Sequence, residues 1–186
     1  MNSMPSDTNA FDAEFLQEVQ RRSEQNLALC YQCGNCTAGC PVSFAYDYPV
    51  NRIMRMLQAG HKKDVLSSKA IWLCASCETC TTRCPNDIDV ARIMDVLRHM
   101  ARAEGLVAEP PVRAFWDSFL SSVERHGRVF EIGLMASYMG RTGKLLTDAD
   151  LAPLALGKGK LSFRPHNIKA VGEIRDIFKR YRELAS

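Results

Sequence analysis

Apolar side chains recur at the spacing of helices along most of the chain, and no stretch keeps the alternation of a half-buried strand. The first amphipathic helix begins at Asp12, a residue type that serves well as an N-cap. Its apolar positions are Phe15, Leu16, Val19 and then Leu27. A second helix has Pro49 in its first turn and ends at Gly60, and residues 61–66 add a short turn. This pattern predicts a fold that is nearly all α.

A similar order of features returns after Pro85. Asp87 or Asp89 can cap a helix that Gly105 ends, and its apolar positions follow the period of one helix face. These positions are Val90, Ile93, Met94, Leu97 and Met100. Each of the two helices follows a short run of cysteines closed by a proline, and the runs start at positions 30 and 74. The repetition indicates an internal duplication that builds a module with two centres.

Cysteine disappears from the chain beyond residue 105, and the composition changes. A helical pattern opens at residues 110–111, and the stretch 129–138 is helical in residue type. Residues 140–165 contain Gly, Lys and Leu without a period and predict an irregular, extended arm. The final segment, 168–184, is spaced as a helical stripe with Arg and Lys between its apolar positions.

The composition is that of an ordinary folded protein, with 46% hydrophobic and 24% charged residues in a chain of 186. A formal net charge of +3 is too small to indicate a nucleic-acid surface, so no nucleic-acid partner is expected. The first residues resemble no secretory signal, and no stretch approaches the ~20 apolar residues that cross a bilayer. We therefore expect a cytoplasmic protein without direct membrane insertion, whose thiols stay reduced and available as ligands.

The eight cysteines carry the chemistry of this sequence, and both runs read C-x2-C-x2-C-x3-C-P. This spacing is typical of [4Fe–4S] ligation, in which the fourth cysteine of each run ligates the other cluster of a two-cluster protein. The sequence therefore predicts two [4Fe–4S] clusters with crossed ligand sets. Cluster 1 takes Cys30, Cys33, Cys36 and Cys84, and cluster 2 takes Cys74, Cys77, Cys80 and Cys40.

The two loops differ in the residues between their cysteines. Gly34 and Gly39 are expected to let the first loop curl closely around its cluster and bring backbone amides toward the sulfurs. The second loop lacks glycine and carries Glu78 and Arg83. Because hydrogen bonds and charge set reduction potentials, the two clusters are expected to differ in potential.

Other uses of eight cysteines fit the spacing less well. Structural zinc normally uses two separated C-x2-C pairs, rather than three cysteines in register with a fourth marked by proline. Disulfides are disfavoured in a reducing compartment. A purely structural role for the clusters is an alternative, although two crossed clusters in one module favour electron transfer.

The residues around the cysteines resemble a known family. Because the stretch between the runs is patterned as helix, residues 27–105 resemble the α-helical ferredoxin modules of succinate dehydrogenase and its relatives. Three segments carry a more specific likeness: the run from Cys30 to Pro41, then Arg52-Ile53-Met54-Arg55-Met56, then Ile71-Trp72-Leu73-Cys74-Ala75-Ser76-Cys77. Their sequence is most similar to the C subunit of heterodisulfide reductases, and a looser likeness at 130–135 and 165–175 favours the bacterial branch.

The resemblance implies a non-catalytic electron-transfer subunit of a hetero-oligomeric oxidoreductase in sulfur metabolism. Its partners would be an A-like flavin and iron–sulfur subunit and a B-like subunit that carries out the thiol and disulfide chemistry. The cysteine-cysteine-glycine motifs of the B-like subunit are absent from this chain, so no catalytic residue is expected here. The alternative is the iron–sulfur subunit of a membrane-associated quinone-linked dehydrogenase or of a sulfite-reduction-linked complex.

The pattern and the resemblance together divide the all-α chain into three parts. They are an N-terminal helical segment over residues 1–26, a two-cluster α-helical ferredoxin domain over 27–105, and a helical C-terminal extension for partner docking over 106–186.

Overall fold

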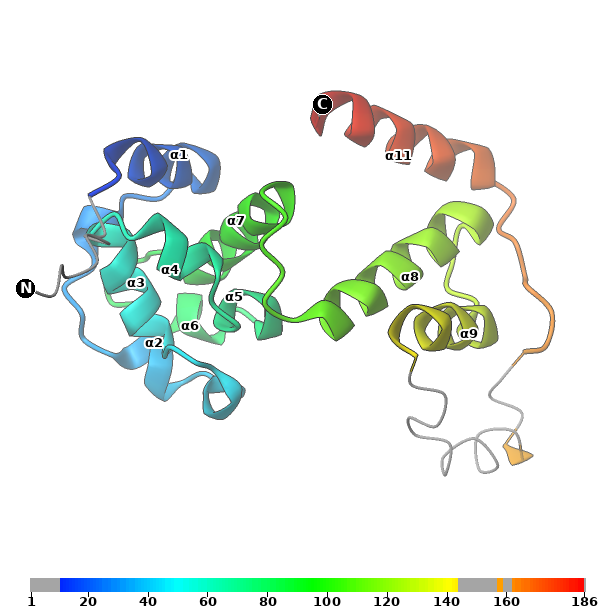
Figure 1. Cartoon of the computed structure of the whole chain (residues 1–186), viewed down its shortest axis with the longest axis horizontal. Helices are drawn as coiled ribbons and strands as arrows, with labels where there is room; N and C mark the ends of the chain where they lie inside the picture. The colour runs from blue at the N-terminus through cyan, green and yellow to red at the C-terminus, as the bar shows by residue number, and fades with distance from the viewer. Residues whose placement is uncertain (1–10, 144–156, 159–161, 186) are drawn as a thin grey trace, which may run out of the picture. The chain divides into compact units, whose positions relative to one another are not determined.

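The computed structural model describes residues 11–143, 157–158 and 162–185, and every regular element within them is a helix (Figure 1). The prediction of an all-α fold is confirmed. The chain divides into two compact units, Met1–Glu109 and Pro110–Ser186, and each is described by itself.

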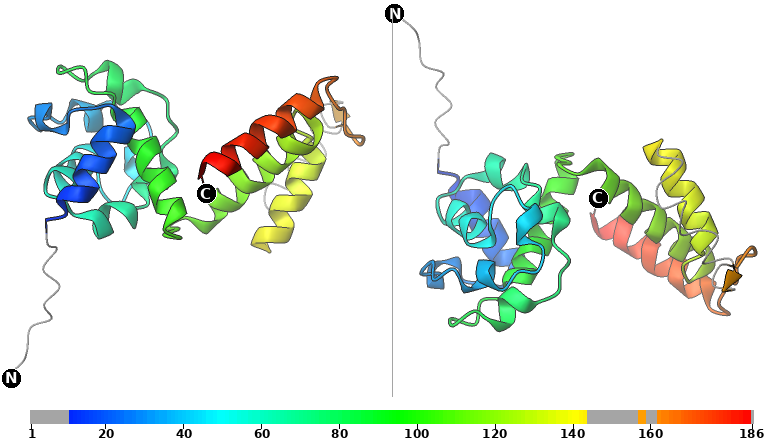
Figure 2. Two further views of the ribbon diagram at one scale, coloured as in Figure 1. Left: turned by 90° about the horizontal axis from the view of Figure 1, so that it is seen from above. Right: turned by 90° about the horizontal axis from the view of Figure 1, so that it is seen from below.

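The first unit holds both cysteine runs, and every regular element among its described residues is a helix (Figure 2). Its elements are α1 (Ala13–Ser23), the 3₁₀ helix η1 (Leu27–Leu29), α2 (Asn35–Ala38), the 3₁₀ helix η2 (Ser43–Ala45), α3 (Val50–Gln58), α4 (Lys62–Leu66), α5 (Ala70–Leu73), α6 (Thr79–Thr82) and α7 (Val90–Ala103). The single turns α2 and α6 lie inside the cysteine runs, and α3 and α7 are the helices that follow each run.

Helix α1 begins where its sequence predicts but ends earlier. The Asp12 carboxylate accepts a hydrogen bond from the Phe15 backbone N at 2.8 Å, which confirms Asp12 as the N-cap. The helix stops at Ser23 because Glu24 takes a left-handed conformation with φ of 57°. The assignment of Leu27 to this helix is therefore wrong, since Leu27 is buried in the separate element η1.

The N-terminal caps of α3 and α7 show where Pro49 lies and which aspartate caps α7. Pro49 lies just before α3, with φ of −62° and an extended ψ of 155°, so its placement in the first turn is corrected by one position. Of the two aspartates offered as caps for α7, Asp89 accepts from the Arg92 backbone N at 3.0 Å. Asp87 instead occupies a turn with φ of 53°.

Helices α3 and α7 are copies of one pattern, with the residues Arg-Ile-Met at 52–54 in the first and at 92–94 in the second. Both helices bury their apolar faces in the core of this unit. The largest fully buried side chains are Leu27, Ile53, Met54, Leu57, Leu66, Ile71, Ile88, Ile93, Met94, Leu97, Val19 and Val65. The duplication seen in the sequence thus places two equivalent helices behind two equivalent loops.

Each of these helices is followed by a glycine in the left-handed region, but the two glycines have different surroundings. Gly60 follows α3 with φ of +66°, and a Cβ built there would lie 2.6 Å from the Asp12 backbone N. Gly105 follows α7 with φ of +72°, and a Cβ there would meet nothing within 4 Å. Gly60 is therefore both a turn residue and the point where the start of α1 approaches α3.

The second unit consists of α8 (Pro110–His126), α9 (Glu131–Thr142) and α11 (Val171–Ala185). Both α9 and α11 contact α8. Helix α9 confirms the helical prediction for 129–138 and continues to Thr142, so the irregular arm expected from 140 is wrong over its first three residues. Residues 144–156 and 159–161 of that arm lie outside the described residues.

The packing of the second unit is looser than that of the first. Among its described residues only Ser118 and Ser122 are buried, and every apolar side chain is at least partly exposed. The Ser122 hydroxyl accepts from the Phe130 backbone N at 2.8 Å, which fixes the start of α9 against α8. An apolar group that includes Phe115 and Trp116 stays about two-fifths exposed. This unit therefore offers apolar surface that it does not cover itself.

Candidate metal centres

The eight cysteines line two cavities of similar size in the first unit. The first cavity is lined by Cys30, Cys33, Cys36 and Cys84. The second cavity is lined by Cys40, Cys74, Cys77 and Cys80. Each cavity thus receives three cysteines from one run and the last cysteine of the other. The structure brings together the same two sets that the spacing predicts.

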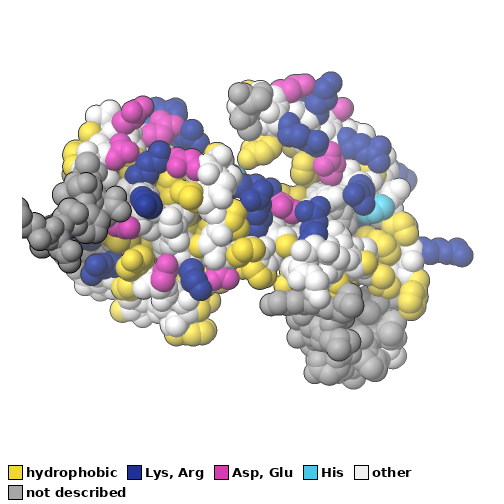
Figure 3. All heavy atoms as spheres, viewed as in Figure 1, with side chains coloured by type: hydrophobic (Ala, Val, Ile, Leu, Met, Phe, Trp, Pro, Cys, Tyr) yellow, Lys and Arg dark blue, Asp and Glu magenta, His cyan; other side chains and the backbone are white. Residues whose placement is uncertain are grey.

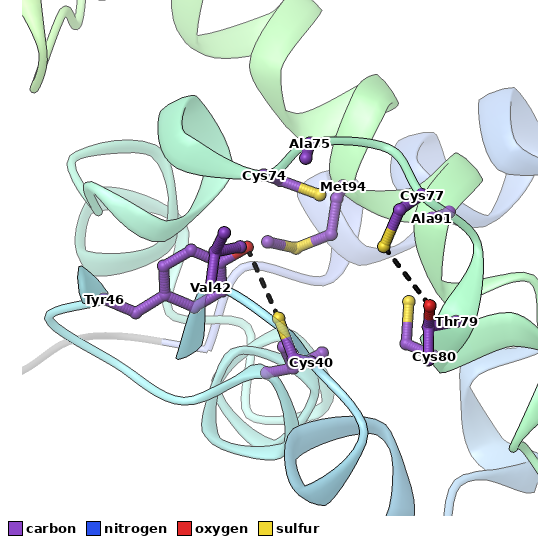
Figure 4. A pocket seen from close by; sticks show the side chains of 11 residues that line it. Cys40, Val42, Tyr46, Cys74, Ala75, Cys77, Thr79, Cys80, Ala91 and Met94 are labelled. Carbon is purple, nitrogen blue, oxygen red and sulfur yellow. Dashed lines mark hydrogen bonds between the residues drawn. The ribbon is translucent and has the colours of Figure 1, made fainter. Parts of the chain in front are cut away.

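Figure 4 shows how the side chains of the second cavity lie. The sulfurs of Cys74, Cys77 and Cys80 come from one loop, and the Cys40 sulfur faces them from the other loop across a shared space. All eight cysteines are free of disulfides. The thiols of each set are therefore available to ligate a group that fills the cavity between them.

In each set the thiols surround a cavity and do not converge on one point. Within the described ranges, no three or more His, Cys, Asp or Glu side chains form a group that could hold a single metal ion. The remaining walls are largely apolar, with Met54, Ile88 and Val90 in the first cavity. Four thiol donors facing a cavity with apolar walls fit an iron–sulfur cluster, whose irons are bound by thiolates and whose potential depends on exclusion of water.

The two loops share a backbone conformation although their sequences differ. In the first loop Gln32 and Gly34 have positive φ, and in the second Ser76 and Glu78 occupy the same places with φ of 48° and 61°. Gly34 therefore serves the curl that its sequence predicts. The second loop makes the same curl with non-glycine residues, which costs about 1 kcal/mol at each such position.

The role predicted for Gly39 is wrong, and the structure gives it another. Gly39 has an ordinary right-handed φ of −92°, so the curl of the loop does not need a glycine there. A Cβ at this position would lie 2.5 Å from the Arg83 Cδ. Gly39 thus makes room for the Arg83 side chain where the two loops meet.

A tyrosine that sequence reasoning missed lies at the second cavity. The Tyr46 hydroxyl oxygen is 3.7 Å from the Cys40 sulfur and faces into the cavity (Figure 4). Burial raises the pKa of Tyr46 far above its usual value, and the Cys74 and Cys40 thiols raise it further. The hydroxyl therefore stays protonated, and its oxygen accepts a hydrogen bond from the Cys40 thiol. At the first cavity the Gln32 amide donates to the Cys30 sulfur at 3.3 Å.

The thiols differ in how readily they lose a proton. Burial raises the pKa of Cys80 to about 11, and the neighbouring Cys74 adds to the effect. Burial likewise raises the pKa of Cys36. The hydrogen bond between Cys77 and Thr79, at 3.4 Å, lowers the pKa of the exposed Cys77. Because only thiolates are ligands, loading of the buried positions must release protons.

The approach to the second loop is anchored by Asp47. Its carboxylate accepts from the Ser68 hydroxyl at 2.7 Å and from the backbone N of Lys69 and Ala70 at 2.8 and 3.1 Å. These donors lie at the start of α5, and α5 leads directly to Cys74. Asp47 therefore caps α5 from a distant part of the chain, and no local sequence signal reveals it.

Replacing Asp47 with alanine is expected to lower the free energy of unfolding by about 1–2 kcal/mol at neutral pH, because four hydrogen-bond donors lose their acceptor. Burial pushes the pKa of Asp47 up, but the hydrogen bonds from Lys69, Ser68, Tyr48 and Ala70 outweigh it and hold the pKa below its ordinary value of 3.8. Its stabilisation is therefore complete above pH 3.8 and is lost as pH falls through the lowered value.

Denaturant unfolding of the wild type and the Asp47 variants at several pH values measures this effect. The Asp47→Asn control keeps an acceptor without a charge and should retain part of the stability but none of the acid dependence. A constant difference between the wild type and Asp47→Ala down to strongly acid pH would contradict the capping role.

Comparison with known proteins agrees with this geometry. Residues 26–88 match the 4Fe-4S dicluster domain family. The matched stretch contains all eight cysteines and both cavities' ligand sets.

Curated relatives extend the similarity beyond the cysteines. The chain is 32% identical over 97 residues to the C subunit of the H(2):CoB-CoM heterodisulfide,ferredoxin reductase of Methanothermobacter thermautotrophicus, covering 52% of each chain. It is 38% identical over 84 residues to the second iron–sulfur C subunit of the CoB–CoM heterodisulfide reductase of Methanocaldococcus jannaschii, covering 45% of each. The chain spans about half the length of the curated relatives it matches. Over that half, the resemblance to the C subunit of heterodisulfide reductases is confirmed.

Proposed function

We propose that this chain is the electron-transfer iron–sulfur subunit of a heterodisulfide reductase-like complex in the cytoplasm. The observation that carries the proposal is the pair of cavities, each lined by three cysteines of one run and the fourth of the other. The dicluster match over the same residues supports it.

In this proposal the first cavity holds one [4Fe–4S] cluster and the second cavity holds another. The proposed ligands are Cys30, Cys33, Cys36 and Cys84 for the first, and Cys74, Cys77, Cys80 and Cys40 for the second. Such clusters each take one electron from a reduced partner and give one electron to an oxidised partner.

The protein's own residues prepare the two sites. Crossed ligation ties each loop to both cavities, so neither loop can move without disturbing the other. Apolar walls such as Met54 and Met94 keep water away from the sulfurs. Cys33 and Cys77 are exposed, which gives each cavity one edge open to a partner.

The partners we propose are an A-like flavin and iron–sulfur subunit and a B-like catalytic subunit. The names of the relatives support this, because they describe C subunits of CoB–CoM heterodisulfide reductases. No helix within the described ranges is long and apolar enough to pass through a bilayer.

The second unit supplies a surface suited to that docking. Along α11, Ile177, Tyr181 and Leu184 are half to nearly nine-tenths exposed. Arg and Lys side chains alternate with these positions along the helix sequence, and Figure 3 shows basic side chains on the helix surface. An exposed apolar row flanked by charge is typical of a subunit interface.

Anaerobic purification of the native complex, with metal analysis, tests the proposal. We expect about eight iron atoms and eight acid-labile sulfides per chain, visible absorbance that dithionite bleaches, and co-purifying flavin and catalytic subunits. The double variant Ile177→Asp and Tyr181→Asp should keep the iron and lose the partners. A colourless chain loaded with zinc would overturn the proposal.

A further inference from the structure

Two equivalent side chains, Gln58 and Arg98, donate hydrogen bonds to the backbone where each cysteine loop begins, and we call them the clamps. In the first half, the Gln58 side-chain amide donates to the carbonyl oxygens of Leu27 and Cys30, both at 2.9 Å. In the second half, Arg98 Nε donates to the Ile71 carbonyl at 2.8 Å, and its Nη2 donates to the Cys74 carbonyl at 2.7 Å. In each half the acceptors are the carbonyls of the first cysteine and of the residue three positions earlier.

The equivalence follows from the duplication. Gln58 directly follows Leu57 at the end of α3, and Arg98 directly follows Leu97 in α7. The residues Arg-Ile-Met stand at the same distance before both positions. The two side chains therefore perform one task, holding the first cysteine of a loop against the helix behind it.

The two clamps differ in charge. Glutamine is neutral, whereas the guanidinium of arginine is always protonated. The Arg98 side chain is only one-fifth exposed, so water screens its charge less than that of a surface arginine. A cation fixed beside a cluster favours the state with one more electron and raises its reduction potential.

We infer that Arg98 is a positioning residue that raises the reduction potential of the second cluster, and that Gln58 holds the first loop without doing so. The inference rests on the proposed two-cluster function. It attributes part of the difference in reduction potential between the two clusters to this pair of residues, because the ligands of the two clusters are alike.

Each of the two helices also carries another charged residue near the clamp. Asp95 accepts from Arg98 Nη1 at 3.1 Å and from the Ser76 hydroxyl at 2.8 Å, and its side chain is nearly half exposed. Arg55 occupies the corresponding position of α3 and is exposed. Because Asp95 forms an ion pair with Arg98, a neutral residue at 98 removes that partner together with the cation. Each variant is therefore compared with the wild-type potential of the same cluster.

Arg98→Gln is the direct test, because Gln58 shows that a glutamine at this place can reach both carbonyls. The potentials of the two clusters are measured by redox titration of the purified cluster-loaded chain, followed by electron paramagnetic resonance. We expect the potential of the second cluster to shift to a lower value and that of the first to stay. The signal that Cys40→Ala removes identifies the second cluster.

Two matched variants separate charge from position. Arg92→Gln removes the same charge from the same helix, but Arg92 pairs with Glu24 and touches no loop carbonyl, so the second potential should stay. Arg98→Lys keeps the charge without the fork of donors and should keep most of the wild-type potential. Iron content and thermal unfolding of each variant show that the fold is intact.

The outcomes distinguish the inference from the function beneath it. Two clusters whose potentials are unchanged in Arg98→Gln overturn the inference and leave the proposed function standing. The inference is also overturned if Arg98→Lys lowers the potential of the second cluster as far as Arg98→Gln does. It is likewise overturned if Arg92→Gln shifts that potential by the same amount. A wild-type chain that binds no iron overturns both.

Discussion

Replacing Cys40 with alanine is expected to remove the cluster of the second cavity and to leave the cluster of the first cavity in place. Cys40 belongs to the first run, but its sulfur faces Cys74, Cys77 and Cys80 (Figure 4). A cluster that loses one of four thiolates is poorly held, so the iron content should fall from about eight to about four per chain.

The measurement is iron and acid-labile sulfide analysis together with electron paramagnetic resonance of the reduced chain. Cys84→Ala is the reciprocal control, because Cys84 belongs to the second run and lines the first cavity. Each variant should keep the signal that the other loses. Loss of the first cluster's signal in Cys40→Ala, with the second intact, would show that each run binds its own cluster.

Replacing Gly60 with alanine is expected to lower the free energy of unfolding of the first unit by about 3 kcal/mol, the second large effect in this chain. About 1 kcal/mol of this comes from the left-handed φ of +66°, which alanine rarely adopts. The rest arises because the new Cβ would lie 2.6 Å from the Asp12 backbone N. That backbone atom cannot move without breaking its own hydrogen bond to the Gly60 carbonyl.

Gly105→Ala separates the two causes. Gly105 has a similar φ of +72° but open space around the position of a Cβ, so only the conformational cost of about 1 kcal/mol applies. Anaerobic thermal unfolding should place the Tm of Gly60→Ala about 10 °C below the wild type and well below that of Gly105→Ala. Equal shifts for the two variants would mean that the approach of α1 to Gly60 contributes nothing.

The parts of this fold that follow from short-range rules were predictable. Asp12 and Asp89 cap the helices that begin beside them, because a carboxylate two or three residues away satisfies the free amides of a first turn. The spacing of the cysteines also predicted which four would meet, since a tight loop around a cluster cannot supply the fourth ligand itself.

Two features were missed because neither the apolar spacing nor the cysteine spacing reports the path of the backbone between the spaced residues. Leu27 falls at a helical spacing from Val19, yet the left-handed Glu24 turns the backbone between them. Tyr46 stands in the linker between Pro41 and Pro49, and nothing in the spacing places that linker over the second cavity.

The roles of Gln58 and Arg98 were predictable only in part. Neither residue forms a motif by itself, and one is neutral while the other is charged. Aligning the two copies of Arg-Ile-Met puts them at the same position, so the duplication itself contains the signal. What the alignment cannot supply is the set of carbonyls they reach, since these depend on how each helix packs against its loop.

The contact between Gly39 and Arg83 constrains how such a chain can change over time. The two residues occupy the same place in the two repeats, and the arginine of one lies where the glycine of the other leaves space. A chain with arginine in both loops would press two like charges together, and one with glycine in both would leave the contact empty. A change at either position therefore alters the contact between the two loops, and the two copies differ at the point where they meet.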